Sequence, residues 1–254
     1  MTVLAVSNLS KSFGGVQAVQ GVQFSVAAGE LLALIGPNGA GKSTCFNMLN
    51  GQLRPDSGHV TLLGRSLIGM APRDIWRLGV GRTFQITATF NSMTVRENIQ
   101  MALLSHNNGL MSFWRPANEM YRDEAMALLE RVGMADQSER PCGILAYGDI
   151  KRVELAIALA NQPKLLLMDE PTAGMAPNER VALMALTAKL ARQDNIAVLF
   201  TEHDMDVVFA QADRIIVLNR GKLIAEGSPE EVRANPEVQA VYLGSGAVYA
   251  GEGH

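Results

Sequence analysis

The chain has 254 residues and a mass of 27.4 kDa, and it is 48% hydrophobic and 19% charged. These values exclude a largely disordered chain, and the length allows one large domain with a subdomain but leaves no room for a tandem duplicate. Lys and Arg total 22 against 25 Asp and Glu, so the net charge of -3 excludes a general electrostatic attraction to nucleic acid.

The first residues, 1–15, contain neither the basic region nor the apolar stretch of a secretory signal. No run of the sequence approaches the about 20 apolar residues that span a bilayer, so we expect a cytosolic protein. The two cysteines, Cys45 and Cys142, are far apart and show no C-x-x-C pattern. This indicates buried neutral thiols and argues against a disulfide framework or a zinc site.

Short segments with polar interruptions and glycine-bounded turns occur early in the chain, at residues 3–7, 22–26 and 58–63. Such segments predict an antiparallel group of strands. The run Leu31 to Ile35 between them is different, because it is apolar at every position and too short for a helix. It predicts a strand that is covered on both faces.

Similar apolar runs recur at residues 165–168, 196–200 and 215–218. Helical patterns separate the first three of the apolar runs, which predicts a parallel sheet with helices outside it. The predicted fold class is therefore α/β, with a mainly parallel sheet and an antiparallel β flank.

From about residue 94 to 162 strand signals vanish and apolar residues recur every three or four positions, as in 119–132 and 150–161. This predicts an inserted helical subdomain. Residues 107–116 interrupt it with turn residues around Phe113 and Trp114, and we expect a loop that packs these aromatics into the core, with a docking surface as the alternative.

We predict a single domain made of a core, a helical subdomain and a tail. The core comprises residues 1–93 and 163–243, the helical subdomain residues 94–162, and a flexible glycine-rich tail residues 244–254.

A phosphate-binding motif follows the first buried strand. The sequence G-x-x-x-x-G-K-[ST] is matched and leads into a helical pattern. Glycines let successive backbone N–H groups turn toward phosphate oxygens, Lys42 neutralises the β and γ phosphates, and the hydroxyl of Ser43 is a ligand for Mg²⁺. The predicted nucleotide-binding residues are Gly36, Pro37, Asn38, Gly39, Ala40, Gly41, Lys42, Ser43 and Thr44.

Two carboxylates, Asp169 and Glu170, end the buried strand that starts at residue 165. Ligands of open α/β sheets bind at this carboxyl edge. We expect Asp169 to orient Mg²⁺ through water and Glu170 to polarise the water that attacks the γ-phosphate.

With these motifs the chain resembles the ATP-binding subunits of ABC transporters, and its fold resembles their P-loop NTPase core with an inserted helical subdomain. A five-residue stretch shortly before Asp169 stands where that family has its signature motif, which contacts ATP bound by a second subunit. Its residues are Leu145, Ala146, Tyr147, Gly148 and Asp149.

The same resemblance implies roles for three further residues. Gln85 resembles the glutamine that contacts Mg²⁺ and senses the membrane subunit, and His203 resembles the switch histidine that contacts the γ-phosphate. Phe13 resembles the aromatic residue that stacks on adenine. For each residue an alternative without a functional role stays open: Gln85 as an ordinary loop amide, His203 as a surface histidine and Phe13 as a core aromatic.

Within the superfamily, residues 79–85, the Ala-Tyr-Gly signature, residues 173–175 and the ending 241–244 resemble branched-chain amino acid importers, specifically the larger of their two ATPase subunits. The resemblance implies a peripheral protein on the cytoplasmic face of the membrane, bound to two permease subunits and a second ATPase subunit. An extracellular or periplasmic binding protein would supply hydrophobic amino acids or related amides and small carboxylates. A homodimeric ATPase of an export or lipid-transport system is the alternative.

The chain departs from the family pattern at four positions. Ala146 and Tyr147 replace the usual serine and glycine, and Asp149 stands where glutamine is usual. A carboxylate near a phosphate is repulsive, so Asp149 would oppose ATP binding there unless Lys151 and Arg152 compensate its charge. Ala176 occupies the place of the D-loop aspartate, which bears on cross-talk between the two sites. Together the departures favour an asymmetric heterodimer with one weaker ATP site.

Overall fold

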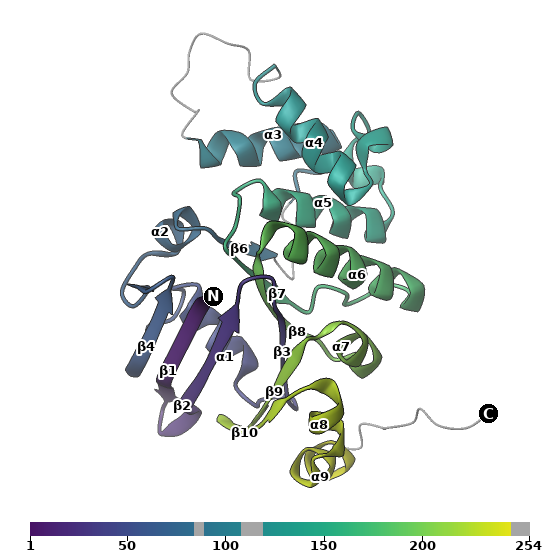
Figure 1. Cartoon of the computed structure of the whole chain (residues 1–254). Coiled ribbons are helices and arrows are strands. Elements are labelled where there is room, and N and C mark those ends of the chain that lie inside the picture. The colour runs from purple at the N-terminus through teal and green to yellow at the C-terminus, as the bar shows by residue number, and fades with distance from the viewer. Residues whose placement is uncertain (84–88, 108–118, 245–254) are drawn as a thin grey trace, which may run out of the picture.

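A computed structural model describes residues 1–83, 89–107 and 119–244 (Figure 1). Gln85, the aromatic pair Phe113 and Trp114, and the expected tail beyond residue 244 lie outside the described residues, so the predictions made for them stay predictions. Within the described part of the chain, no helix is both long enough and apolar enough to cross a bilayer.

The strands form two sheets, one of six strands in the order β10-β9-β3-β8-β7-β6 and one of four strands in the order β2-β1-β4-β5. In the larger sheet the pairs between β9 and β6 are parallel and only β10 runs antiparallel to β9, whereas all pairs of the smaller sheet are antiparallel. The predicted α/β class, with its mainly parallel sheet and antiparallel flank, is confirmed. The strands are β1 (Thr2–Phe13), β2 (Val16–Ala27), β3 (Leu31–Ile35), β4 (Ser57–Leu62), β5 (Arg65–Ser66), β6 (Val80–Thr83), β7 (Leu165–Asp169), β8 (Ala197–Thr201), β9 (Arg214–Asn219) and β10 (Lys222–Gly227).

The outer strands of the larger sheet, β6 and β10, were not predicted from the sequence. Strand β6 contains Gly81 and Arg82, and β10 mixes apolar with charged residues, so neither shows the uniformly apolar run of a central strand. Strands β1 and β2 are also longer than expected, because register shifts let their polar interruptions stay within the ladder.

The helices cover the larger sheet on both faces. Helices α3 to α6 lie on one side of it, far from the four-stranded sheet, and α1 lies between the two sheets (Figure 1). Helix α4 begins at Arg122 and α5 at Tyr147, so the first starts later and the second earlier than expected. The α-helices are α1 (Lys42–Leu49), α2 (Pro72–Arg77), α3 (Val95–His106), α4 (Arg122–Val132), α5 (Tyr147–Leu159), α6 (Pro177–Asp194), α7 (Met205–Gln211), α8 (Pro229–Ala234) and α9 (Pro236–Gly244).

The central strands are buried on both faces because they separate two hydrophobic clusters. In β3, Leu32 and Leu34 pack with α1 and the four-stranded sheet, while Leu31, Ala33 and Ile35 belong to the cluster on the helical side. Successive side chains of a strand point to opposite faces, so an uninterrupted apolar run can fill both clusters. The carboxyl edge of this rigid sheet is where the polar residues described next converge.

Candidate functional site

The phosphate loop, residues 36–44, connects β3 to α1 and approaches neighbouring backbone closely. A Cβ atom at Gly36 would lie 2.1 Å from the carbonyl oxygen of Leu218, and one at Gly41 would lie 2.4 Å from that of Ala18. Both glycines also have positive φ values, 149° and 108°. A side chain at either position is therefore sterically excluded, which explains why the loop is rich in glycine.

Lys42, the first residue of α1, folds its side chain back onto the start of this loop. Its Nζ donates hydrogen bonds to the carbonyl oxygens of Gly36, at 2.6 Å, and Pro37, at 3.2 Å, and the side chain is buried. Burial lowers the pKa of Lys42, and the negative charges of Glu170 and Asp169 oppose that shift. The amine thus stays close to two carboxylates while it is withdrawn from water.

The other predicted residues of the loop differ in exposure. Asn38, Gly39 and Ser43 are exposed, Pro37, Gly41 and Thr44 are partly buried, and Gly36 and Ala40 are buried. The exposed members follow Lys42 or lie at the turn of the loop, where a bound anion could reach the backbone N–H groups.

Asp169 ends β7 and lies opposite Thr201, which ends the parallel neighbour β8. The Thr201 hydroxyl donates to Asp169 Oδ1 at 2.7 Å and accepts from the backbone N–H of Glu170 at 3.1 Å. Arg82 of β6 approaches the other oxygen, with its Nη2 at 4.0 Å from Asp169 Oδ2. Sequence analysis assigned no role to Thr201 or Arg82. The final residue of a buried strand was a searchable signal for Thr201, whereas Arg82 lies one residue before the end of β6, a strand without a uniformly apolar run.

Glu170 and His203 contact each other across the edge of the sheet. His203 Nε2 lies 2.7 Å from Glu170 Oε1, and the histidine side chain is 51% exposed against 24% for the glutamate. Glu170 has a φ of 49°, in the left-handed region that residues other than glycine rarely adopt. The backbone therefore directs this carboxylate away from the strand axis and toward the histidine.

Phe13 ends β1 and pairs with Val16 at the end of the hairpin. Its ring is 49% exposed, and Lys11 Nζ lies 5.6 Å from the ring centroid. The following strand passes the phosphate loop, since Ala18 abuts Gly41. The ring of Phe13 is thus exposed at the end of a hairpin whose second strand abuts the phosphate loop, and its role as a platform for adenine stays a prediction.

The signature segment, residues 145–149, lies at the start of α5 and not with Lys42. The ring of Tyr147 lies 3.4 Å from the position that a Cβ would take on Gly174, and a Cβ on Gly148 would lie 3.1 Å from the Glu179 carboxylate. Leu145 is buried, whereas Ala146 is exposed as the residue that precedes the helix. The segment therefore packs against the loop that follows Glu170 and against the start of α6.

Asp149 pairs with neither Lys151 nor Arg152, the two cations that could have compensated its charge. Asp149 Oδ2 accepts a hydrogen bond from Gln137 Nε2 at 3.1 Å. Lys151 is buried and pairs with Glu154 at 2.9 Å, and Arg152 Nη1 points to the Val132 carbonyl oxygen at 3.4 Å. Helix residues two positions apart do not face each other, which explains the direction of Lys151, whereas Arg152 is at a spacing that could reach Asp149 and instead donates to the end of α4.

The structure thus gathers Lys42, Asp169, Glu170 and His203 at one edge of a parallel sheet, beside a glycine loop at a helix N-terminus. Within the described residues, no cluster of three or more His, Cys, Asp or Glu side chains is arranged to hold a metal ion alone. The fold is that of a P-loop NTPase, a class in which a backbone cradle and a lysine bind the phosphates of a nucleotide.

Comparison with known proteins places the chain within this class. The family model described as ABC transporter matches residues 19–173, more than half of the chain, and the chain belongs to this family. It is an ATP-binding cassette and hydrolyses ATP. A second model, described as branched-chain amino acid ATP-binding cassette transporter, matches residues 222–248.

Individual relatives span almost the whole chain. The chain is 43% identical to the high-affinity branched-chain amino acid transport ATP-binding protein LivG of Salmonella typhimurium, over 95% of this chain and 98% of the relative. It is 42% identical to the corresponding protein BraF of Pseudomonas aeruginosa, with the same coverage. Among solved structures, the ADP conformation of an ATP-binding cassette of an ABC transporter has a TM-score of 0.86 and 33% identity, covering 96% of this chain and 99% of that one.

Proposed function

We propose that this chain is an ATPase subunit that energises the import of branched-chain or other hydrophobic amino acids, or of related small amides and carboxylates. The observation that carries the enzymatic part is the contact of His203 with Glu170 at the sheet edge that also holds Lys42. The transported class is supported by the names of relatives that match the chain from end to end.

In the proposed reaction, backbone N–H groups of the phosphate loop and the Lys42 amine bind the β and γ phosphates. Lys42 would then exchange its bonds to the loop carbonyls for bonds to phosphate oxygens. Glu170 polarises the attacking water, and His203, held beside it, contacts the γ-phosphate. The ring of Phe13 stacks on the adenine, and the amide of Gln85 contacts the metal ion and reports to the membrane subunit.

The residues at the sheet edge fit a magnesium ion. Mg²⁺ keeps several waters and is held by one or two protein oxygens together with substrate phosphates, so a cage of protein ligands is not required. Ser43 offers an exposed hydroxyl one residue after Lys42, and Asp169 is oriented by Thr201. When bound, the ion neutralises charge on the β and γ oxygens.

The signature segment is proposed to contact ATP that is bound by a second ATPase subunit. Its departures favour a heterodimer in which the phosphate loop of this chain hydrolyses ATP against the full signature of its partner. The pair would act on two permease subunits from the cytoplasmic face, with Gln85 and helical residues 94–162 as the lever, and an extracellular or periplasmic binding protein would deliver the cargo.

The test is ATP hydrolysis and transport by the assembled complex in proteoliposomes. We expect ATP turnover and uptake to rise with a binding protein loaded with a hydrophobic amino acid and to stay low with a polar one. Outward movement of a lipid or other export substrate, with no response to amino acids, would support the homodimeric exporter. Absence of saturable ATP binding would contradict the whole proposal, because every later step depends on a bound nucleotide.

A further inference from the structure

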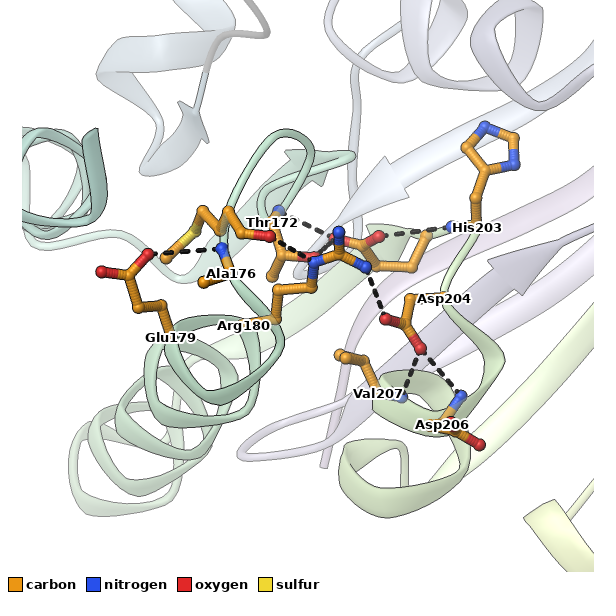
Figure 2. Close-up of polar contacts among 10 residues, drawn as sticks. Thr172, Ala176, Glu179, Arg180, His203, Asp204, Asp206 and Val207 are labelled. Carbon is orange, nitrogen blue, oxygen red and sulfur yellow. Dashed lines mark hydrogen bonds and ion pairs between the residues drawn. The ribbon is translucent and has the colours of Figure 1, made fainter. Parts of the chain in front are cut away.

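Two loops meet beside the Glu170 and His203 pair, and hydrogen bonds link them. The first, residues 170–176, follows β7, and the second, residues 202–204, follows β8 and leads into α7. Figure 2 shows the side chains that connect the loops, with Arg180 of α6 reaching toward Asp204. The connections form an inner and an outer link.

The inner link is the carboxylate of Glu202. One oxygen accepts from the backbone N–H of Thr172, at 2.8 Å, and from its hydroxyl, at 2.7 Å. The other oxygen accepts from the backbone N–H of His203 at 3.2 Å. Glu202 is buried, so its carboxylate bonds to the two loops and is shielded from solvent. Burial, with the neighbouring charge of Glu170, raises its pKa in spite of these hydrogen bonds.

The outer link is the guanidinium of Arg180. Its Nε donates to the carbonyl oxygen of Met175 and its Nη1 donates to Asp204 Oδ2, both at 2.7 Å. Asp204 Oδ1 accepts from the backbone N–H groups of Asp206 and Val207 and so caps α7. Because a guanidinium is planar and presents its donors in a fixed fork, it holds both partners in one geometry.

We propose that Arg180 is a positioning residue for ATP hydrolysis, which holds the loop before Ala176 and the loop of His203 as one unit. Asp204 is the next residue after His203, so a displacement of Met175 is passed through the guanidinium to the switch histidine. Ala176 has no polar side chain for such a link, and Arg180 supplies it from the following helix. The proposal rests on the role of His203 in the proposed function.

The location of the pair argues against a mainly structural role. Arg180 is 31% exposed and Asp204 is 24% exposed, and ion pairs that water reaches contribute little to global stability. The same helix carries a matched pair away from the loops, in which Arg192 Nη2 contacts Asp213 Oδ1 at 2.8 Å with 55% and 40% exposure. Arg192→Met is therefore a control for loss of an arginine ion pair on α6.

The experiment measures kcat, KM and ATP affinity for the full chain in its assembled complex. We expect Arg180→Met and Asp204→Asn each to lower kcat about tenfold while the Kd for ATP changes by less than about twofold. Asparagine can still cap α7, so Asp204→Asn removes the pair and keeps the helix start. The double variant should be no slower than either single variant, since both remove one link. Arg180→Lys should recover only part of the rate, and Arg192→Met should match wild type.

Wild-type kcat in Arg180→Met would overturn the inference, and so would a double variant whose losses multiply. A parallel fall in Tm and ATP affinity, without a selective fall in kcat, would assign Arg180 a structural role and also overturn it. His203→Ala in the same assay separates the two proposals. If that variant hydrolyses ATP normally, the role of His203 fails; if it is slow while Arg180→Met is normal, only the positioning role fails.

Discussion

Two helix N-termini of this chain, those of α1 and α5, differ in charge. Each follows an irregular stretch that contains glycine. The first turn of α1 contains no acidic residue and begins with Lys42, whereas the first turn of α5 contains Asp149. In addition, Gly148 of α5 lies against the carboxylate of Glu179. The first turn of α1 thus has no acidic residue of its own, although the charges of Asp169 and Glu170 act on the Lys42 amine, whereas the first turn of α5 has one acidic residue and lies against a second.

This difference bears directly on phosphate binding. The N–H groups and the dipole at a helix N-terminus favour anions, and carboxylates nearby satisfy part of that preference. At the start of α1 the charge of Lys42 offsets the two nearby carboxylates, whereas Asp149 and Glu179 lie at the start of α5, so in the proposed assembly α5 would offer less to the γ-phosphate of a second ATP. The comparison therefore favours an asymmetric pair of ATP sites, with the stronger one on the phosphate loop of this chain.

The largest effect is expected at Lys42. Lys42→Ala should reduce ATP turnover by at least about 100-fold, because it removes the charge that faces the transferred phosphate. The amine also bonds to Gly36 and Pro37, so the thermal midpoint should be recorded with the rate. If Lys42→Ala turned over ATP at close to the wild-type rate, the start of α1 would not be the stronger phosphate-binding site, and the contrast with α5 would fail.

The asymmetry itself is tested at Glu170. Glu170→Gln should lower the ATPase rate of the assembled complex by about 100-fold, because the amide cannot polarise the attacking water. The equivalent change in the second ATPase subunit should cost far less. Equal losses in the two variants would rule out unequal sites.

A smaller and more selective effect is expected at His203. His203→Ala should bind ATP with wild-type affinity and hydrolyse it about tenfold more slowly, since the ring contacts Glu170 and is half exposed. Equilibrium binding of a labelled ATP, measured beside single-turnover hydrolysis, separates these steps. Loss of binding with unchanged single-turnover chemistry would contradict the assignment.

At the start of α5, removal of a negative charge is expected to increase activity. Asp149→Asn keeps an oxygen for Gln137 and removes the charge, so we expect about a twofold gain in ATP turnover of the complex. The helix should lose roughly 0.3–1 kcal/mol of stability, because a favourable charge leaves its N-terminus. Asp123→Asn, in the exposed first turn of α4, is the control for that stability loss. A gain of turnover in both variants would argue against a role for Asp149 near phosphate.

An effect that is absent at neutral pH concerns Cys45 in α1, where burial raises the thiol pKa to about 12. In the unfolded chain the thiol loses its proton near its ordinary value of 9.0, so between that pH and about 12 the native state holds the proton and the unfolded state does not. Unfolding free energy should therefore fall as pH rises above 9.0, by up to about 1.4 kcal/mol per pH unit. Urea unfolding of wild type and Cys45→Ala over this range checks it, and identical slopes would show that the α1 side of the sheet admits water.

Much of this molecule follows from local sequence. The phosphate loop can be recognised from consecutive residues, because its glycines and Lys42 lie within one short segment. The unbroken apolar run of β3 likewise indicates a strand that is buried on both faces. The acidic end of β7 is equally local. From these segments the fold class, the ATPase activity and the family could all be predicted before any contact was known.

Only the tertiary structure decided which distant residues meet. The register of β7 and β8 sets Thr201 beside Asp169, the left-handed backbone of Glu170 turns its carboxylate to His203, and α6 brings Arg180 to Asp204. It also turned Lys151 away from Asp149, because helix geometry and burial set the direction of that side chain. Local pattern specifies backbone conformation and chemistry, whereas contacts between separate segments depend on packing, which no short stretch of sequence contains.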